Sequence, residues 1–103
     1  MDNIKVLIKE PWKKAVMKEI PNTLEALQKI VGGFIELVTI STDVSAVVNE
    51  EGLINGLKYN VSIGGHALFG TVILLGIDGE DFCSLQYSLN TIKIVLPALF
   101  VGE

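Results

Sequence analysis

The short stretch "PWKK" combines residue types that could bind a nucleotide. Trp12 is the chain's single tryptophan, and Lys13 and Lys14 follow it directly. A surface indole can stack on a base, which contributes about 1–3 kcal/mol per base, while the ammonium groups contact phosphates. The alternative is that Trp12 packs on a neighbouring subunit or covers the core. We predict Trp12, Lys13 and Lys14 as ligand-binding residues at the tip of a lysine-rich hairpin.

A second group of candidates lies in "NVSIGGH", residues 60–66. The Asn60 amide both donates and accepts hydrogen bonds, so it suits the edge of a base. Unhindered backbone N–H groups at Gly64, Gly65 and His66 can form an anion-binding concavity. A flexible loop or a bulge that leads into a strand is the alternative. We predict that these four residues complete the same site, because a chain without arginine must bind phosphate through lysine, hydroxyl and backbone groups.

Residues for catalysis and metal binding are few. His66 and Cys83 are the single histidine and the single cysteine, and a long predicted strand separates them. A structural zinc site within one chain needs four such ligands. We therefore expect no enzyme activity, no metal and no cofactor.

Two acidic turns allow two interpretations. "NEEG" carries Glu50 and Glu51, and "DGED" carries Asp78, Glu80 and Asp81 in a spacing that matches no calcium loop. Each is typical of a solvated turn, and in "NEEG" we expect Gly52 to supply a positive φ. The alternative for Glu50 and Glu51 is contact with the hydroxyls of a ligand or the basic patch of a partner. The alternative for Asp78, Glu80 and Asp81 is that their oxygens attract a divalent cation.

The elements that must position these residues begin with a hairpin and a helix. "IKVLIKE" alternates apolar and polar residues as a half-buried strand does, and "AVMKEI" follows after the "PWKK" turn. "PNTLEALQKIVGG" predicts a helix over residues 22–31, with Asn22 as its cap, Glu25 in a capping box and Gly32 at its end.

The rest of the chain predicts more strands and a second helix. Strands are expected over residues 34–40, 44–48 and 67–77, with a short one over 53–57. A helix capped by Ser84 should continue to Leu96, because Pro97 forbids its extension. The predicted fold class is α+β: a mainly antiparallel sheet with two helices packed against it, in one domain over residues 1–103.

The composition of the chain leads to predictions about its assembly, its partners and its location in the cell. Half of the residues are hydrophobic and the mean hydropathy is +0.50, so either the core is unusually dominant or another subunit covers apolar surface. We favour a homo-oligomer joined through apolar C-terminal surface. No stretch of about 20 apolar residues exists, so we expect no membrane partner. Without arginine, sequence-specific nucleic-acid binding is not expected. The N-terminus resembles no signal peptide and one cysteine fits a reducing compartment, so the predicted location is the cytoplasm.

The order of several motifs resembles a family of small uncharacterised proteins common in phages and mobile elements of Gram-positive bacteria. The resemblance covers about residues 4–85, and its most specific parts are "LEALQKIVGGFIE", "NEEG" and "GIDGEDFCSL". The chain departs from the family pattern at two positions. Trp12 stands where the family usually has glycine after the first proline, and Val61 stands where an arginine often follows the asparagine matched by Asn60.

The resemblance implies a phage or mobile-element context and a protein that acts in the cytoplasm of a bacterial host. With the candidate residues above, it leads to the hypothesis of a non-enzymatic protein that binds and sequesters a nucleotide-derived host defence signal. The alternative is a protein-interaction module that inhibits or redirects a host protein through Trp12, Phe34 and the acidic turns.

Overall fold

A central antiparallel sheet organises the protein, in a computed structural model that describes residues 2–101. Its strands β1 (Asn3–Lys9), β2 (Val16–Pro21), β3 (Ile35–Ser41), β4 (Val44–Asn49) and β7 (Val72–Asp78) lie in the order β2-β1-β7-β4-β3. A short strand, β8 (Asp81–Cys83), extends β7 as a hairpin. Every pairing is antiparallel, so β7 at the centre runs opposite to both β1 and β4.

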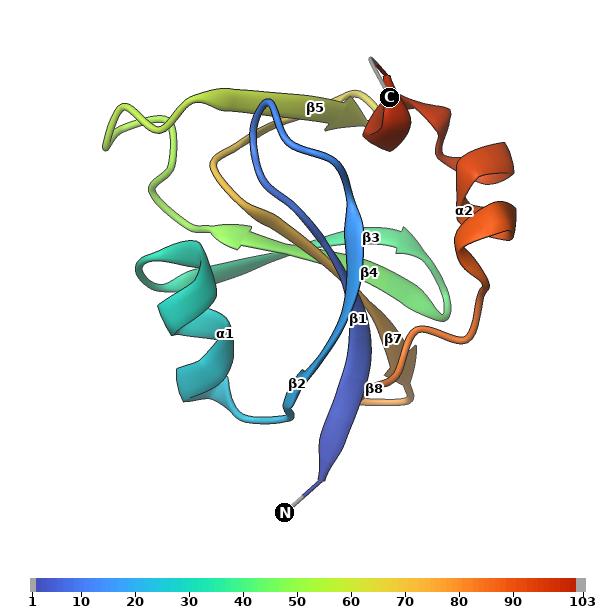
Figure 1. Ribbon diagram of the computed structural model, residues 1–103. Coiled ribbons are helices and arrows are strands. Elements are labelled where there is room, and N and C mark those ends of the chain that lie inside the picture. Colours follow the sequence, from blue (N-terminus) through green and yellow to red (C-terminus); the bar gives the residue numbers. More distant parts are fainter. Residues whose placement is uncertain (1, 102–103) are drawn as a thin grey trace.

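Helices and a small second sheet cover the two faces of the central sheet. Helix α1 (Leu24–Val31) packs on one face through Leu27 and Val31. The other face is covered by a two-stranded sheet, β5 (Tyr59–Ile63) and β6 (His66–Phe69), by helix α2 (Leu89–Val95) and by the 3₁₀ helix η1 (Pro97–Phe100). Figure 1 shows α1 and α2 on opposite sides of the strands. The predicted α+β fold is confirmed.

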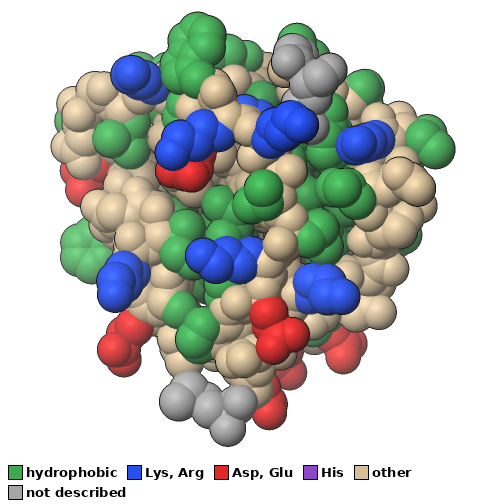
Figure 2. Space-filling view, in the orientation of Figure 1, with side chains coloured by type: hydrophobic (Ala, Val, Ile, Leu, Met, Phe, Trp, Pro, Cys, Tyr) green, Lys and Arg blue, Asp and Glu red, His purple; other side chains and the backbone are tan. Residues whose placement is uncertain are grey.

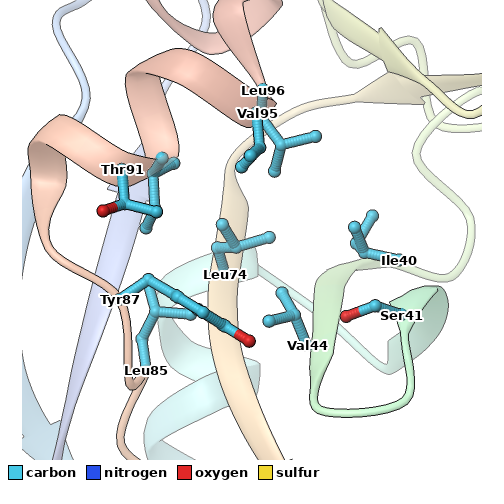
Figure 3. A pocket seen from close by; sticks show the side chains of 10 residues that line it. Ile40, Ser41, Val44, Leu74, Leu85, Tyr87, Thr91, Val95 and Leu96 are labelled. Atoms are coloured by element: carbon cyan, nitrogen blue, oxygen red, sulfur yellow. The ribbon is translucent and has the colours of Figure 1, made fainter.

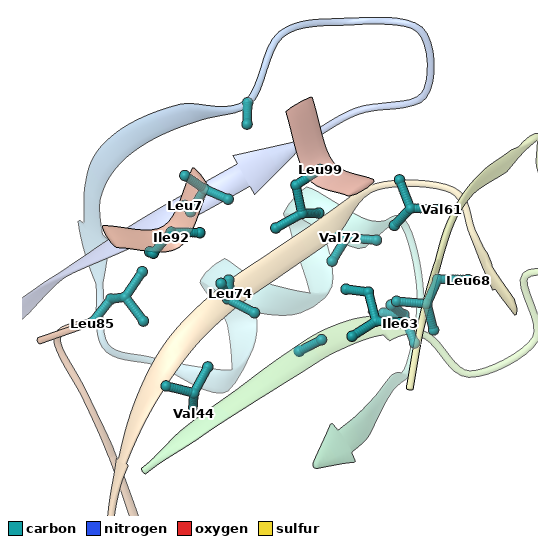
Figure 4. Close-up of a cluster of buried hydrophobic side chains, with 13 residues drawn as sticks. Leu7, Val44, Val61, Ile63, Leu68, Val72, Leu74, Leu85, Ile92 and Leu99 are labelled. Atoms are coloured by element: carbon teal, nitrogen blue, oxygen red, sulfur yellow. The ribbon is translucent and has the colours of Figure 1, made fainter. Parts of the chain in front are cut away.

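Burial on both faces explains why the central strands are so apolar. All six residues of β4 are buried, and so are the first five of β7. Figure 4 shows the layer between the sheet, the β5–β6 hairpin and the C-terminal segments, where Leu74 of β7 and Leu99 of η1 are almost fully buried. Neither α-helix within the described residues is long and apolar enough to cross a membrane.

Helix α1 begins and ends at residues with specific backbone chemistry. Thr23, not the predicted Asn22, is the N-cap, because its hydroxyl accepts a hydrogen bond from Ala26 N at 3.1 Å. The Asn22 side chain instead donates to Phe82 O at 3.1 Å and so ties the start of α1 to β8. Gly32 closes the helix with φ 83, as predicted.

The segment between β4 and β7 differs from the prediction in three places. Residues 53–57 form turns and no strand, since Asn55 N bonds to Glu51 O and Leu57 N to Gly52 O. The strand β5 was not predicted. The long strand expected over residues 67–77 is divided into β6 and β7 at Gly70, whose φ of 80 redirects the chain from the small sheet into the large one.

The C-terminal helix begins later than predicted. Ser88 caps α2 by accepting from Thr91 N at 3.2 Å, whereas the Ser84 hydroxyl accepts from Lys5 N at 2.9 Å. Leu85 N also donates to Lys5 O at 2.8 Å, so residues after β8 pair with β1 instead of starting a helix. This close approach requires Gly76, because a Cβ there would lie 2.4 Å from Ser84 O and 2.8 Å from Cys83 Sγ.

Candidate ligand-binding site

The loop between β1 and β2 holds Trp12 in an unusual backbone conformation. Lys13 N donates to Glu10 O at 3.2 Å, which closes a turn with Pro11 and Trp12 at its centre. Trp12 has φ 67 and is the one non-glycine residue with a positive φ in the described part of the chain. Proline followed by a positive φ is the pattern of a type II turn, whose second central position favours glycine. Trp12 therefore occupies a position suited to glycine.

The Trp12 side chain gains little from packing in this conformation. It is 86% exposed. A non-glycine residue in the left-handed region costs about 1–3 kcal/mol, and such strain is concentrated at binding and catalytic sites. The ring is thus presented to solvent at an energetic cost that contacts within the chain do not offset.

Trp12 borders an open cavity of about 590 Å³, which we call the Trp12 cavity. Its walls come from the β1–β2 loop, the end of α1, the segment before β5 and the β6–β7 corner, and they comprise residues 10–13, Val31, Leu57, Lys58, Gly70 and Thr71. Figure 2 shows lysine side chains spread over the face that carries the β1–β2 hairpin, with acidic side chains mainly toward its lower edge. The cavity combines an exposed aromatic ring with two lysines.

The lysines beside Trp12 are available to a ligand. Lys13 Nζ lies 3.5 Å from Glu10 Oε2, but both side chains are largely exposed, so this ion pair contributes little stability. Lys14 is exposed on the same loop without lining the cavity, and Lys58 lines it from the segment before β5. Three ammonium groups therefore belong to the cavity or its rim.

Asn60 lies beneath this cavity and connects its walls. Its Nδ2 donates to Lys9 O and to Gly70 O, both at 2.8 Å, so both amide hydrogens are engaged. Its Oδ1 is buried without a hydrogen-bond partner among the described residues. Gly70 N donates in turn to Lys58 O at 2.7 Å. Asn60 thus joins the end of β1 to the β6–β7 corner that forms one wall.

The glycine-rich candidates lie in a different cavity. Gly64 and Gly65, with φ 57 and 83, form the tight turn between β5 and β6, as a type I′ turn requires. Gly65 and the exposed His66 line a cavity of about 330 Å³ together with Glu36 and Glu50. The structure therefore brings Trp12 and Lys13 together, and it places residues 65 and 66 in surroundings that contain carboxylates.

The remaining polar candidates occupy turns. In "NEEG", Asn49 is buried and holds the turn, since its Nδ2 donates to Val31 O at 3.2 Å and its Oδ1 accepts from Glu51 N at 2.8 Å. Glu50 and Glu51 are exposed. Residues 78–81 form the β7–β8 turn, where Gly79 has φ 64. No group of three His, Cys, Asp or Glu residues within the described part of the chain could hold a metal ion.

Sequence reasoning did not identify Lys58, Gly70 and Thr71 as cavity residues. Lys58 is far from Trp12 in the sequence, and no local motif connects them. The connection comes from the sheet, because Lys9 at the end of β1 pairs with Val72 at the start of β7. That Lys58, Gly70 and Thr71 lie near Trp12 follows only from the pairing of β1 with β7.

The fold and this cavity define a small α+β domain with a central antiparallel sheet, covered on both faces, and an exposed tryptophan beside a cavity lined by lysines. The chain belongs to the family described as a domain of unknown function, DUF3846, which it matches over residues 4–94. No curated protein matches it. No solved structure matches it either.

Proposed function

We propose that the protein binds a nucleotide-derived small molecule in the Trp12 cavity and holds it without cleaving it. The observation that carries this proposal is the conformation of Trp12, which is 86% exposed at φ 67 beside a cavity lined by Lys13 and Lys58. A bulky residue at a position suited to glycine is expected where the side chain itself is used.

Each part of the cavity has a role in this proposal. The indole of Trp12 stacks on the base, a contact that tolerates any base because every base has a π face. Lys13, Lys14 and Lys58 contact the phosphates, with charge-assisted hydrogen bonds in place of the absent arginines. Thr71 lies in the wall, and a threonine hydroxyl is suited to hydrogen bonding with a ribose hydroxyl.

The predicted contribution of residues 64–66 depends on assembly. Gly65 and His66 line a different cavity from that of Trp12, so one ligand contacts both only if it spans the two cavities or if two subunits meet there. We propose a homo-oligomer in which the β5–β6 turn of one subunit completes the Trp12 cavity of another. This arrangement would enclose a polar ligand more fully than a single small domain does.

The biological setting of the proposal follows from the family resemblance. In a phage or mobile-element protein that acts in the bacterial cytoplasm, a bound nucleotide would be a host defence signal, such as a cyclic oligonucleotide or an ADP-ribose derivative. Sequestration then requires only affinity and abundance. Exposed aromatic and basic residues beside an open cavity support binding of this kind.

Calorimetric titration against ADP-ribose and a panel of cyclic dinucleotides tests the proposal. We expect binding at micromolar concentrations or below, with the ligand recovered unchanged by chromatography. The Lys13→Ala/Lys14→Ala variant should bind more weakly. A Lys18→Ala/Lys29→Ala variant removes the same charge from β2 and α1 and should bind normally. If both variants lose the same affinity for the nucleotide, binding depends on net charge and not on the Trp12 cavity. If the recovered nucleotide is chemically altered, the protein is an enzyme.

A second candidate function rests on exposed apolar residues. Phe34, directly before β3, is 67% exposed, and Trp12 is also exposed, as expected for anchors of a protein interface. Two results together would favour this interaction module over the nucleotide-binding function. The protein would bind no nucleotide, and it would form a complex with a host protein that the Phe34→Ser variant no longer forms.

A further inference from the structure

A second cavity, distinct from the Trp12 cavity, lies between α2 and the central sheet. It encloses about 430 Å³, a volume in the range of small-molecule sites. Leu74 and Val44 form its floor, Ile40 lies on the β3 side, and Val95 of α2 forms its upper wall. Ile92 of α2 also lines the cavity. Most of its lining is therefore hydrocarbon.

Two hydroxyls of this cavity lie together at one side, which we call its mouth. Ser41 and Tyr87 line the cavity there, and Figure 3 shows their oxygens turned toward each other. The third lining hydroxyl, that of Thr91, points away from them and lies 3.1 Å from Ser88 Oγ. The two hydroxyls at the mouth both donate to the carboxylate of Asp43, Tyr87 to Oδ2 and Ser41 to Oδ1 at 2.9 Å. The mouth thus carries hydroxyls with a carboxylate directly behind them.

The charge at this mouth is negative under neutral conditions. The hydrogen bond from Tyr87, followed by the one from Ser41, lowers the pKa of Asp43, so its carboxyl is ionised. Among the described residues, no lysine lines the cavity. The lysine of α2, Lys93, instead lies over the ring of Phe100 at 5.5 Å. The Asp43 carboxylate would repel an anionic group at this mouth, and no lysine among the described lining residues would offset that repulsion. The same carboxylate would attract a cationic group.

We propose that this cavity binds an amphiphilic amine, with its hydrocarbon part between α2 and the sheet and its ammonium group at the Asp43 mouth. Burial of the hydrocarbon supplies affinity in proportion to the apolar area removed from water. The carboxylate and hydroxyls select the head group, because a carboxylate accepts hydrogen bonds from an ammonium and repels a fatty acid. This site is independent of the nucleotide site, which lies on other elements.

Three probes with the same tail and different heads test the proposal on the unaltered protein: octylamine, octanol and octanoate. Calorimetry gives the affinities, and amide chemical shifts of the lining residues locate the ligand. We expect octylamine to bind most tightly and octanoate most weakly, with shifts at Thr91 and Val95. Octanoate that binds as tightly as octylamine, or shifts confined to other regions, would overturn the proposal.

Two variants separate cavity binding from general attraction to an acidic protein. Asp43→Asn should weaken octylamine by about fivefold, the upper end for an exposed ion pair, and leave octanol unchanged. Glu80→Gln removes the same charge from the exposed β7–β8 turn and should change neither affinity. Equal losses of octylamine affinity in both variants would overturn the role of Asp43.

A cavity-filling variant tests the location. Thr91→Phe places a ring in the cavity while the backbone N–H of residue 91 still bonds to the Ser88 cap, so α2 should keep its start. We expect it to abolish binding of octylamine and octanol. A folded Thr91→Phe protein that binds octylamine normally would show that the ligand lies elsewhere. Should one variant fail to fold, the head-group series on the unaltered protein still decides.

Discussion

At the residue scale, Trp12 allows stability and binding to be separated. Because its φ of 67 suits glycine, Trp12→Gly keeps the turn and removes the strain, while an 86% exposed ring contributes little packing. We expect the free energy of unfolding to rise by up to about 1 kcal/mol, since the relief exceeds the extra chain entropy of glycine. Nucleotide binding should weaken by at least tenfold, about 1.4 kcal/mol, through lost stacking.

Urea unfolding and calorimetric titration of the same preparation measure both effects of Trp12→Gly. The opposite direction of the two changes is the informative result, because simple loss of fold would lower stability and binding together. If the variant is clearly less stable than the unaltered protein, the ring packs against the chain or a second subunit, and its proposed role in stacking is wrong.

Asn60 provides a second prediction at this scale. Its two N–H groups face the carbonyls of Lys9 and Gly70 at 2.8 Å, so Asn60→Asp replaces donors with an acceptor of the same shape. We expect a loss of about 1–3 kcal/mol in the free energy of unfolding, because two carbonyls lose their partner. Thermal unfolding measures it. Asn55→Asp, at an exposed turn residue, is the matched control and should have little effect.

The sequence predicted some properties of these residues and missed others. The position of Trp12 at a hairpin tip followed from the strand period and the proline. The positive φ of Trp12 did not, because tryptophan in itself favours other conformations. Asn60 has a suitable amide for a ligand, yet its amide hydrogens bond to backbone carbonyls from elements distant in sequence, which no local pattern encodes.

At the element scale, β8 is held so close to β7 that Gly76 tolerates no side chain. The Cβ of Gly76→Ala would meet Ser84 O at 2.4 Å, so β8 and the following residues must shift. We expect a loss of about 1–3 kcal/mol. Gly32→Ala is the control, since nothing lies within 4 Å of that Cβ and its cost comes from the backbone alone.

The thiol of Cys83 reports on the same element. Desolvation, assisted by the carboxylates of Asp78 and Asp43, raises the pKa of Cys83, so little thiolate is present in the folded protein. Alkylation by iodoacetamide at about pH 8 should therefore be slower than for an unhindered cysteine peptide, whose pKa is about 8.5. Gly76→Ala should accelerate it and Gly32→Ala should not. Equal rates in all three proteins would show that β8 does not shift.

The bond between Tyr87 and Asp43 connects the segment before α2 to the turn between β3 and β4. It lowers the pKa of Asp43 and raises the pKa of Tyr87. The lowered pKa of Asp43 stabilises the fold at pH values above the aspartate pKa of the unfolded chain, about 3.9. This stabilisation is lost as the pH falls through the pKa of Asp43 in the folded protein. The raised pKa of Tyr87 stabilises the fold below the ordinary tyrosine pKa of about 10. This stabilisation is lost as the pH rises through the pKa of Tyr87 in the folded protein.

The stability difference between the unaltered protein and Tyr87→Phe should therefore be constant from about pH 5 to 9 and shrink on either side. Urea unfolding across this range measures the difference. A difference that stays unchanged into the acid range would mean that the hydroxyl does not depend on the Asp43 carboxylate.

Elements with strong local signals were predicted and those fixed by distant contacts were not. The β1–β2 hairpin, α1, β3 and β4 have clear periodicity or end at glycine. The long apolar run before Ile77 gave no sign of the break at Gly70, because β6 and β7 are equally apolar and belong to different sheets. Ser84 has the chemistry of a helix cap, but its hydroxyl bonds to Lys5 N across the sheet.

At the scale of the whole molecule, the high mean hydropathy has two sources. The first is the fold itself, because β4 and β7 are covered on both faces and need no polar residues. The second is apolar surface on the C-terminal segments, where Ile94 is 79% exposed and Val101 is 81% exposed. The first source explains part of the composition without any partner, so the proposed homo-oligomer depends on the second.

This C-terminal surface leads to the final prediction, that Ile94 lies in a subunit contact. An exposed isoleucine beside Val95 on a short helix adds apolar area that a second subunit would remove from water. Light scattering coupled to size-exclusion chromatography should give a mass above 11.2 kDa at micromolar concentration. Ile94→Lys should reduce it to the monomer, whereas Leu24→Lys, on the exposed side of α1, should not. If the unaltered protein is a monomer, the high hydropathy comes from the core that covers both faces of the sheet. The proposed nucleotide site between two subunits would then be wrong.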